Sequence, residues 1–400
     1  MRVLIANKLA PFVPGRLQDV GCTVTVDPTA AGPTLTERIR AEDPEIVIVR
    51  GTKVTAADFE AGKSLALVIR AGAGVNTIDL AAASRRGVYV ANCPGKNAIA
   101  VAELAMGLLV SCDRRIVDNA VDLRARRWNK KKYGAARGLA GRTLAVIGAG
   151  QIGQEVISRA LAFRMNVVAW SPSLTDAKAA ALGVRRAPTV EDAVKNADAV
   201  TVHLALAKET RGRIGASVFA AMKPGAIFLN TSRGEVVDQP ALVDAIKTKQ
   251  LRAGLDVFAN EPAGAEGVFE DDIVDLPEVY GTHHIGASTD EAEEAVGEET
   301  VRIVAAYKGG APIPNCVNLA SRTPATHLLV VRHADQVGVL AGILAVIREA
   351  GINIEDMQNI IFSGGQAACA RIGLGACLPD ASVARIAQDA AIYSVSQVPV

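Results

Sequence analysis

The sequence has few of the residues that mark several protein classes. Aromatic residues make up 4% of the 400 residues, so aliphatic side chains must fill the core. There are five histidines and six cysteines, and neither type clusters at the spacing of metal ligands or forms a CxxC pair; the cysteines stand at positions 22, 93, 112, 316, 369 and 377. This scatter argues against a zinc site or a disulfide framework and predicts reduced thiols in a cytoplasmic protein.

The sequence also lacks an excess of charge of either sign and a long apolar run. With 43 basic and 42 acidic residues the formal net charge is +1, which gives no electrostatic basis for binding nucleic acid or an acidic membrane. A basic run at residues 124–132 is interpreted as a solvated surface. No run reaches the length of a membrane span, and the first residues become polar too early for a secretory signal. We therefore expect a small-molecule partner.

What the sequence does have is apolar bulk and chain length. Half of the residues are apolar and 21% are charged, which is typical of globular domains with large cores. A chain of 400 residues predicts two or three such domains.

One glycine-rich stretch, within residues 143–170, points to a ligand. An apolar run at 144–147 is followed by GAGQIG, by a helical pattern at 151–161 and by a second apolar run at 167–170. Strand, G-x-G-x-x-G, helix and strand form the dinucleotide-binding pattern: the glycines allow a tight turn, a close approach of the pyrophosphate and the packing of helix on strand. The helix N-terminus would then hold the phosphates. The cofactor-binding candidates here are Gly148, Gly150, Gln151, Ile152 and Gly153.

The end of the second strand departs from the usual pattern. An acidic residue normally binds the adenosine ribose of NAD at this point, and Ser171 stands there instead. Serine would not repel a ribose 2′-phosphate, but the nearest basic residue along the chain is Lys178. We expect NAD as the cofactor, with NADP left open.

Elsewhere, apolar strand patterns alternate with helical ones. Strands are expected at 2–6, 45–49, 65–70 and 88–91, and again at 198–203, 226–230 and 252–257, with helices at 35–41, 98–117, 217–222, 240–247 and 289–307. Such alternation predicts two Rossmann-like, doubly wound parallel sheets of the α/β class. We expect a discontinuous substrate-binding domain (1–97 and 286–318) and a dinucleotide-binding domain (98–285), with sites at the carboxyl ends of strands.

The pattern changes after a linker at 319–325. Strands at 326–333, 352–361, 368–374 and 393–400, with helices at 337–350 and 381–391, give the order βαββαβ. This order predicts a third, small α+β domain over residues 326–400.

Several motifs together resemble the D-2-hydroxyacid dehydrogenase family. They are RAGAGVNTID at 70–79, NCPGKNAIAVAELAMGLL at 92–109, TSRGEVVD at 231–238, DVFANEP at 256–262 and THHIGAST at 282–289. The tail resembles an ACT domain, a regulatory module that senses amino acids, through VRHADQVGVL at 331–340 and GINI at 351–354.

The resemblance implies a catalytic set of Arg233, Glu261 and His284. A histidine titrates in the range that suits a general base for the substrate hydroxyl. Glu261 would orient this base and stabilise its charged form, and Arg233 would hold the substrate carboxylate by a two-point contact. His283 is the neighbour of His284 and stands where the family has proline. From the residues alone, either histidine could be the base, or both could be structural.

The same resemblance implies the remaining binding residues. Substrate would meet Arg50, Lys53, Gly74, Val75 and Asn97, with a basic residue at position 50 facing a phosphate. His203, Thr231, Asp256 and Gly286 would join the cofactor site. Each has a plainer interpretation: Arg50 as a solvated charge, Asp256 as a loop cap, and the loop of Gly72 and Gly74 as a tight turn.

The combination of the two resemblances implies NAD-dependent oxidation of D-3-phosphoglycerate to 3-phosphohydroxypyruvate, the first step of phosphorylated L-serine biosynthesis. The alternatives are a glyoxylate or hydroxypyruvate reductase, with NADPH left open as its cofactor, and a non-catalytic corepressor-like protein. The ACT resemblance implies a serine or other amino-acid effector at His333, Asp335 and Asn353, with Asp335 replacing the family's asparagine. The long helix at 98–117 and the ACT module both suggest a homodimer or homotetramer.

Overall fold

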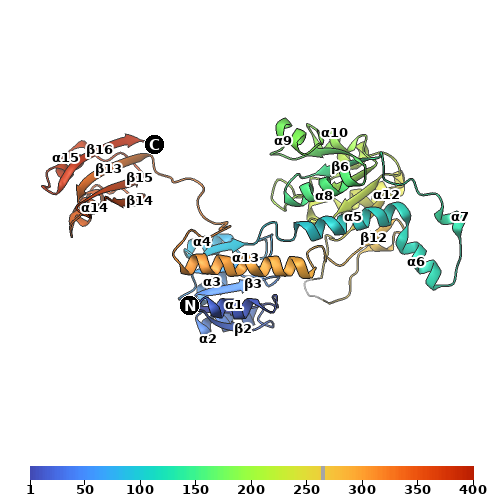
Figure 1. The fold of residues 1–400 in the computed structure, drawn as a ribbon, viewed down its shortest axis with the longest axis horizontal. Helices are drawn as coiled ribbons and strands as arrows, with labels where there is room; N and C mark the ends of the chain where they lie inside the picture. The colour runs from blue at the N-terminus through green and yellow to red at the C-terminus, as the bar shows by residue number, and fades with distance from the viewer. Residues whose placement is uncertain (263–265) are drawn as a thin grey trace. The chain divides into compact units, whose positions relative to one another are not determined.

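The computed structural model describes residues 1–262 and 266–400. The chain divides into two compact units, residues Met1–Asn318 and Leu319–Val400, which are coloured blue to orange and orange to red in Figure 1. The first unit holds two parallel sheets and the second holds one antiparallel sheet. The predicted fold class is confirmed, whereas the domain boundaries at 97, 285 and 325 stay predictions.

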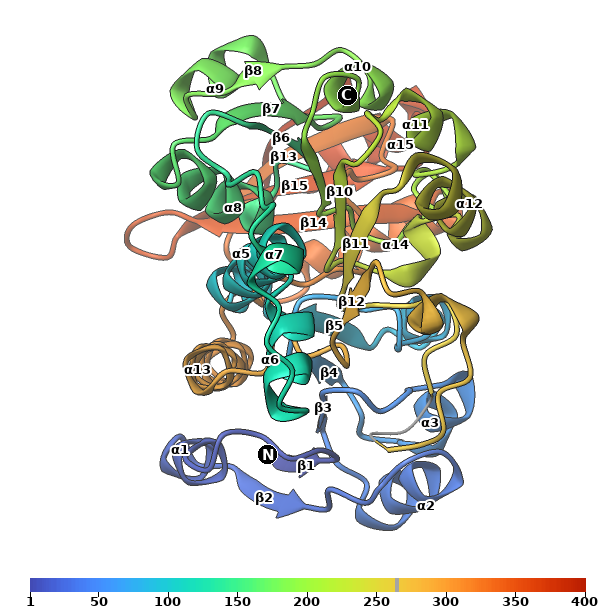
Figure 2. The ribbon, with the colours of Figure 1, turned by 90° about the vertical axis from the view of Figure 1, so that its right-hand side faces the viewer.

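The first sheet contains the strands predicted at the start of the chain and one more. Its order is β2-β1-β3-β4-β5, all parallel, as Figure 2 shows. The strands are β1 (Arg2–Ile5), β2 (Thr23–Val26), β3 (Ile46–Val49), β4 (Leu67–Arg70) and β5 (Tyr89–Asn92), and the helices between them are α1 (Val13–Asp19), α2 (Pro33–Glu42), α3 (Ala56–Ala61) and α4 (Leu80–Arg85). Every residue of β3 is buried, as expected for a central parallel strand covered on both faces.

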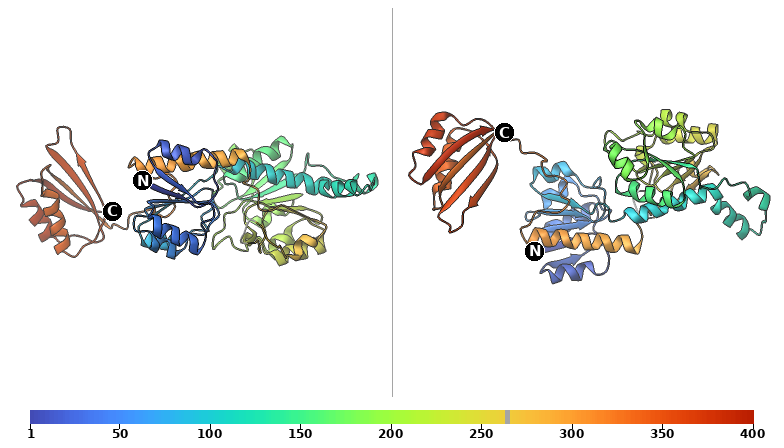
Figure 3. Two further views of the ribbon diagram at one scale, coloured as in Figure 1. Left: turned by 90° about the horizontal axis from the view of Figure 1, so that it is seen from below. Right: turned by 45° about the horizontal axis from the view of Figure 1, so that its top comes forward.

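A distant helix completes one face of this sheet. Helix α13 (Asp290–Lys308) contributes Val301, Ile303 and Val304 to the core that also contains Val3 and Ile5 of β1. Figure 3 shows this helix, in orange, alongside the blue sheet. The chain thus returns to its first sheet after residue 290, and the discontinuous domain stays a prediction.

The second sheet has the order β12-β11-β10-β9-β6-β7-β8 and is also parallel. Its strands are β6 (Thr143–Ile147), β7 (Asn166–Trp170), β8 (Arg185–Arg186), β9 (Ala199–Val202), β10 (Ile227–Asn230), β11 (Arg252–Leu255) and β12 (Val279–Gly281). Its helices are α5 (Ala98–Arg114), α8 (Gln151–Ala162), α9 (Asp176–Ala181), α10 (Val190–Val194), α11 (Ala216–Ala221) and α12 (Gln239–Lys249). Helix α5 lies so close to β11 that a Cβ on Gly254 would stand 3.0 Å from Leu108 Cβ.

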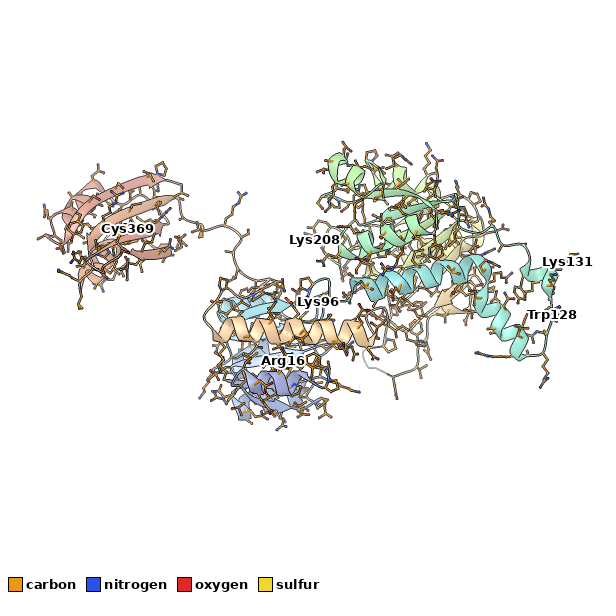
Figure 4. All side chains as sticks on the ribbon, viewed as in Figure 1. Arg16, Lys96, Trp128, Lys131, Lys208 and Cys369 are labelled. Carbon is orange, nitrogen blue, oxygen red and sulfur yellow. The ribbon has the colours of Figure 1, made fainter. Side chains whose placement is uncertain are left out.

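The helix predicted at 98–117 is shorter than expected. It ends at Arg114, because Arg115 adopts a left-handed backbone with φ of 52° that interrupts the helix. Helices α6 (Ile116–Arg124) and α7 (Lys130–Tyr133) follow, and they contain no buried residue. Figure 4 labels Trp128 and Lys131 on this projection, and Trp128 is 82% exposed.

The second unit follows the predicted βαββαβ order. Its elements are β13 (His327–Ala334), α14 (Val339–Glu349), β14 (Ile354–Ile361), β15 (Ala367–Leu374), α15 (Asp380–Ala387) and β16 (Ile392–Pro399). The sheet order is β14-β15-β13-β16, and the pairs are antiparallel. Both helices pack their apolar side chains into one core with this sheet.

Two further observations concern the expectations from composition. No helix among the described residues is long and apolar enough to cross a membrane. All six cysteines, whose positions lie within the described ranges, are free thiols.

Candidate active site

The glycine-rich loop is shaped by close backbone contacts. Gly148 has φ of 104°, donates its N–H to the carbonyl of Trp170 at 2.7 Å, and would place a Cβ 2.4 Å from the His203 carbonyl oxygen. A Cβ on Gly153 would stand 1.9 Å from the Gly148 oxygen. Gly150 differs, because a Cβ there would meet no atom within 4 Å. The loop therefore leaves open space at the N-terminus of α8, where a pyrophosphate would sit.

Buried polar atoms without partners lie on the segments beside this loop. His203 Nε2 shares a 2.9 Å hydrogen bond with Thr201 Oγ1, but His203 Nδ1 is buried and has no partner among the described residues. The same is true of Thr231 Oγ1. Burial lowers the pKa of His203 to about 4, so its ring is neutral near pH 7. Unsatisfied buried groups at strand ends suit a dinucleotide ligand, and the residues fit the cofactor that the motif implies.

The other two cofactor candidates of the loop differ in exposure. Gln151 is exposed, and its side chain reaches Gly95, where a Cβ would stand 2.3 Å from Gln151 Oε1. Ile152 is half-buried in the first turn of α8. Gln151 therefore connects the cofactor loop to the segment just before α5.

The surroundings of Ser171 contain a basic residue that the sequence pattern missed. Ser171 is half-buried directly after β7. The guanidinium carbon of Arg213 lies 5.5 Å from the centre of the ring of Trp170, the residue just before the serine. Arg213 is 42 residues away in the chain, and only the folding of the sheet brings it here.

His284 and Glu261 form the hydrogen-bonded pair that a general base needs. His284 Nδ1 lies 2.7 Å from Glu261 Oε2, and Glu261 Oε1 accepts the Phe258 N–H at 2.9 Å. Because a carboxylate only accepts, Nδ1 carries the proton and Nε2 of the neutral ring is left as a base. Partial burial alone would raise the pKa of Glu261, but its hydrogen bonds with His284 and Phe258 outweigh burial and lower that pKa. Glu261 is therefore an anion near neutral pH.

The structure distinguishes the two neighbouring histidines. Both are exposed, but among the described residues His284 has a carboxylate partner and His283 has no hydrogen bond from its ring. His284 adopts a left-handed backbone with φ of 54°, which is unusual for a residue with a β-carbon. The geometry favours His284 as the base.

Asp256 holds this unusual loop in place. Its side chain is buried, and it accepts hydrogen bonds from Thr282 Oγ1 at 2.6 Å, Ile285 N at 2.9 Å and Gly286 N at 2.9 Å. Its backbone carbonyl accepts the His284 N–H at 2.8 Å. A side chain at Gly286 would crowd this contact, since a Cβ there would stand 3.0 Å from Asp256 Oδ2. In this arrangement the carboxylate of Asp256 and the N–H of Gly286 are directed at each other.

Arg233 links the two sheets at the site. It follows β10, its Nη1 donates to the Ser232 carbonyl at 2.6 Å, and its own carbonyl accepts from Asn230 at 3.0 Å. Its Nη2 lies 2.7 Å from where a Cβ on Gly74 would be, so glycine lets the guanidinium approach the loop after β4. Gly74 and Val75 are half-buried in this loop. Arg233 also lies near enough to Glu261 to help lower its pKa.

A cavity of about 70 Å³ opens beside this loop and holds two arginines. It is lined by residues from the ends of β3 and β4, from the start of α5 and from α13, among them Arg50, Arg70, Gly72, Asn97 and Glu293. Burial first, and then the charges of Arg233 and Arg50, lower the pKa of Arg70 to about 10, so this guanidinium is still charged at pH 7. Cations held this close together favour an anionic ligand.

Two details of this cavity differ from the sequence analysis. Arg70, the last residue of β4, was not among the predicted site residues, although its position at a strand end was a usable signal. Asn97 stands just before α5, where its side chain makes no capping hydrogen bond, and its Oδ1 is buried without a described partner. Lys53 is exposed and does not line the cavity.

The three effector candidates do not meet within one chain. His333 is 1% exposed, with Nδ1 donating to the Ala334 carbonyl at 2.7 Å and Nε2 3.2 Å from Asn359 Oδ1. Ala334 pairs with Ala367, whereas Ile354 pairs with Leu374 at the other end of β15. Asp335 and Asn353 therefore lie on the order of 20 Å apart along the strands.

Comparisons with known proteins agree with this geometry. A family described as D-isomer specific 2-hydroxyacid dehydrogenase, NAD binding domain, matches residues 106–286. A hydroxypyruvate reductase from Thermotoga maritima is 41% identical over 64% of this chain and 82% of its own. The chain belongs to the D-isomer specific 2-hydroxyacid dehydrogenase family, and it carries that family's NAD-binding domain.

Two further proteins, one compared by sequence and one by structure, are similar to this chain. A D-3-phosphoglycerate dehydrogenase from Methanocaldococcus jannaschii is 36% identical over 80% of this chain and 60% of its own. The chain spans between 52% and 64% of the length of the phosphoglycerate dehydrogenases that it matches. The crystal structure of an Aquifex aeolicus D-lactate dehydrogenase with NAD and lactic acid superposes with a TM-score of 0.70 at 26% identity, over 80% of this chain and all of that one.

Proposed function

We propose that this protein oxidises D-3-phosphoglycerate to 3-phosphohydroxypyruvate with NAD, the first step of phosphorylated L-serine biosynthesis. The observation that carries the proposal is one site that combines a histidine–carboxylate pair with three charged arginines. The pair supplies a base for the substrate hydroxyl, and the arginines match a substrate that has a carboxylate at one end and a phosphate at the other.

His284 and Glu261 would remove the hydroxyl proton. With Nδ1–H donated to Glu261, the lone pair of Nε2 accepts the proton from the substrate oxygen. The imidazolium that forms faces a carboxylate 2.7 Å away, and this charge contact stabilises it. The left-handed backbone of His284, held by Asp256, fixes where the ring points.

Arg233 would hold and orient the substrate. Its guanidinium offers two parallel N–H groups to a carboxylate, a contact that fixes the position of the neighbouring carbon. When bound at the glycine-rich loop, NAD supplies the acceptor for the hydride that leaves this carbon. Gly74 leaves room for the guanidinium beside the loop after β4.

Arg50 and Arg70 would bind the phosphate. They line the cavity with Asn97, whose Oδ1 has no hydrogen-bond partner among the described residues and would accept a hydrogen bond from a hydroxyl of the substrate. Burial, and next the repulsion between guanidinium groups, lower the pKa of Arg70, and a phosphate dianion would offset that repulsion. A hydroxyl in its place would leave that repulsion in force.

Steady-state kinetics with matched variants test this assignment. We expect Arg50→Met and Arg70→Met to raise the KM for D-3-phosphoglycerate by about tenfold or more, because each removes a charge-assisted contact, and to leave the KM for D-glycerate unchanged. Lys53→Met is the control, since Lys53 carries the same charge but does not line the cavity. Equal effects of all three variants, or no preference of the unaltered protein for the phosphorylated substrate, would contradict the proposal.

A hydroxypyruvate reductase is the second candidate, favoured by one observation. Ser171 and the nearby Arg213 make the end of β7 compatible with a phosphorylated ribose, and the Thermotoga maritima relative carries that name. If the protein reduces hydroxypyruvate with NADPH faster than it oxidises 3-phosphoglycerate with NAD, it is a hydroxypyruvate reductase. No turnover with either pair would point instead to a binding protein.

We further propose that the second unit is an ACT-like regulatory module. Its βαββαβ order and antiparallel sheet support this, and the separation of Asp335 from Asn353 suggests that an effector site needs residues from two chains. The assembly would then be a homodimer or a homotetramer. Titrating the rate with L-serine tests the effector, and a rate unchanged up to millimolar serine would exclude serine in that role.

A further inference from the structure

The cavity that holds Arg50 and Arg70 also contains an acidic side chain. Glu293, in the first turn of α13, lines this cavity, and its Oε1 lies 2.7 Å from Arg50 Nη1. The two side chains are 37% and 33% exposed, so water reaches both partners. One of the two arginines in the cavity, Arg50, is therefore already ion-paired with a carboxylate of the protein.

The other cation of the cavity is not neutralised in this way. Among the described residues Arg70 forms no ion pair with a carboxylate, and its buried Nε has no hydrogen-bond partner. The position of Arg50 does not depend on Glu293 alone, because its backbone N–H donates to Asn7 Oδ1 at 2.7 Å. Glu293 can therefore leave without freeing the loop that carries Arg50.

The strength of the ion pair decides what can displace Glu293. A pair with both partners a third exposed is weak, because water screens it and ordering two long side chains costs entropy. A phosphate dianion offers Arg50 a two-point contact with more charge than a carboxylate does. A neutral hydroxyl offers no charge, so it would leave the guanidinium with Glu293.

We propose that Glu293 is a specificity-determining residue, a displaceable counter-ion that occupies Arg50 until a dianionic group enters the cavity. This inference rests on the proposed function for the identity of the substrate. Glu293 weakens the binding of every anion at this place, and it excludes groups too weakly charged to displace it. Only a substrate whose group in this cavity carries enough negative charge to displace Glu293 would then bind Arg50.

The plainer interpretation is that the ion pair of Glu293 with Arg50 is a structural tie, that is, a contact that only holds α13 against the end of β3. A tie contributes to stability and has no reason to act on one substrate more than another. Without the charge of Glu293, a counter-ion predicts a lower KM for a phosphorylated substrate, whereas a tie predicts an unchanged or raised KM, so one substitution separates them.

The experiment compares Glu293→Gln with Glu294→Gln on the full chain. Glutamine keeps the size and removes the charge, and Glu294 is an exposed neighbour that does not line the cavity. We expect E293Q to lower the KM for D-3-phosphoglycerate about two- to fivefold at unchanged kcat, the range of a screened ion pair. We expect the same factor in the Kd of inorganic phosphate measured by calorimetry, and no change with D-glycerate or in E294Q.

Each other outcome overturns either this inference or the proposed function. A KM that is unchanged or raised in E293Q, with a lower melting temperature, would identify a structural tie and overturn the inference. Tighter phosphate binding in E293Q without any turnover of 3-phosphoglycerate by the unaltered protein would overturn the proposed function and keep the counter-ion. Glu293→Asp, which keeps the charge on a shorter side chain, should fall between the unaltered protein and E293Q.

Discussion

Replacing Asp256 with asparagine separates two roles that this residue could have. The sequence resemblance assigns Asp256 to the cofactor, whereas the structure directs both of its carboxylate oxygens at the loop that carries His284. Asparagine keeps the shape but turns one oxygen into an NH2 group, which cannot accept from a backbone N–H. In Asp256→Asn at least one of the three donors, from Thr282, Ile285 or Gly286, loses its acceptor.

The size of the effect follows from burial. Gly286 and the Asp256 side chain are buried, and an unsatisfied buried donor costs about 1–3 kcal/mol. The left-handed backbone of His284 adds a cost of order 1 kcal/mol that the loop must already overcome. Since about 1.4 kcal/mol corresponds to a factor of ten in rate, we expect kcat to fall about five- to a hundredfold as His284 loses its position.

Three measurements on D256N test this reasoning. They are kcat, the Kd of NAD by fluorescence titration, and the melting temperature. A fall in kcat with the Kd of NAD nearly unchanged supports the loop role. Thr282→Val serves as a milder variant, because it removes one hydrogen bond and leaves the two backbone donors paired. If D256N keeps its kcat and instead weakens NAD binding by an order of magnitude, the loop argument is wrong and the cofactor role is right.

Three further predictions concern the cofactor loop and the titrating groups. Gly153→Ala should lower the melting temperature, because its Cβ would stand 1.9 Å from the Gly148 oxygen. Gly150→Ala should fold normally, since its Cβ would meet no atom within 4 Å, but it should lose NAD binding in a fluorescence titration. Normal NAD binding by G150A would refute the placement of the pyrophosphate. His203 has its pKa lowered to about 4 by burial, so the unfolded chain binds its proton first as pH falls below about 6.5, and the chain should lose stability between that pH and 4; His203→Gln should flatten this part of a melting-temperature profile. Glu261 has a lowered pKa, so the stability it contributes is present above the ordinary glutamate pKa of about 4.3 and is lost as pH falls through its pKa in the folded protein. The difference in melting temperature between Glu261→Gln and the unaltered protein should therefore shrink in that acidic range. A constant difference would contradict the ionised state of Glu261.

The fold could be predicted to a large extent because the buried parallel strands are short apolar runs. The strands β3, β6 and β10 are each buried over almost their whole length, and such runs are visible without periodicity. Strand β2 was missed, because Thr23–Val26 lies at a sheet edge and is only partly buried, so its composition is mixed. The break at Arg115 was also missed, since a left-handed arginine leaves no mark in the sequence.

Site residues could be predicted where they lie inside a distinctive sequence motif whose role is known. His284 and Glu261 come from separate motifs, but each motif is distinctive, and the structure brings the two side chains together. Arg213 near Trp170 and Glu293 on Arg50 were not found, because each pair joins residues far apart in the chain. Charge partners of this kind depend on packing, which no local pattern encodes. The substrate and effector roles stay predictions.

The return of α13 to the first sheet has a consequence for synthesis of the chain on the ribosome. The core of β1–β5 contains side chains from α13, whereas the second sheet draws all its strands from the segment in between. At about 5–20 residues per second, roughly 200 residues of translation, or about 10–40 seconds, separate β5 from α13. During that interval the first sheet exposes the apolar face that Val301 and Val304 later cover, while the second sheet can already close. Within the first unit, the sheet made first is thus the sheet finished last. Destabilising changes in α13 should therefore reduce the yield of folded protein more than their effect on the melting temperature suggests.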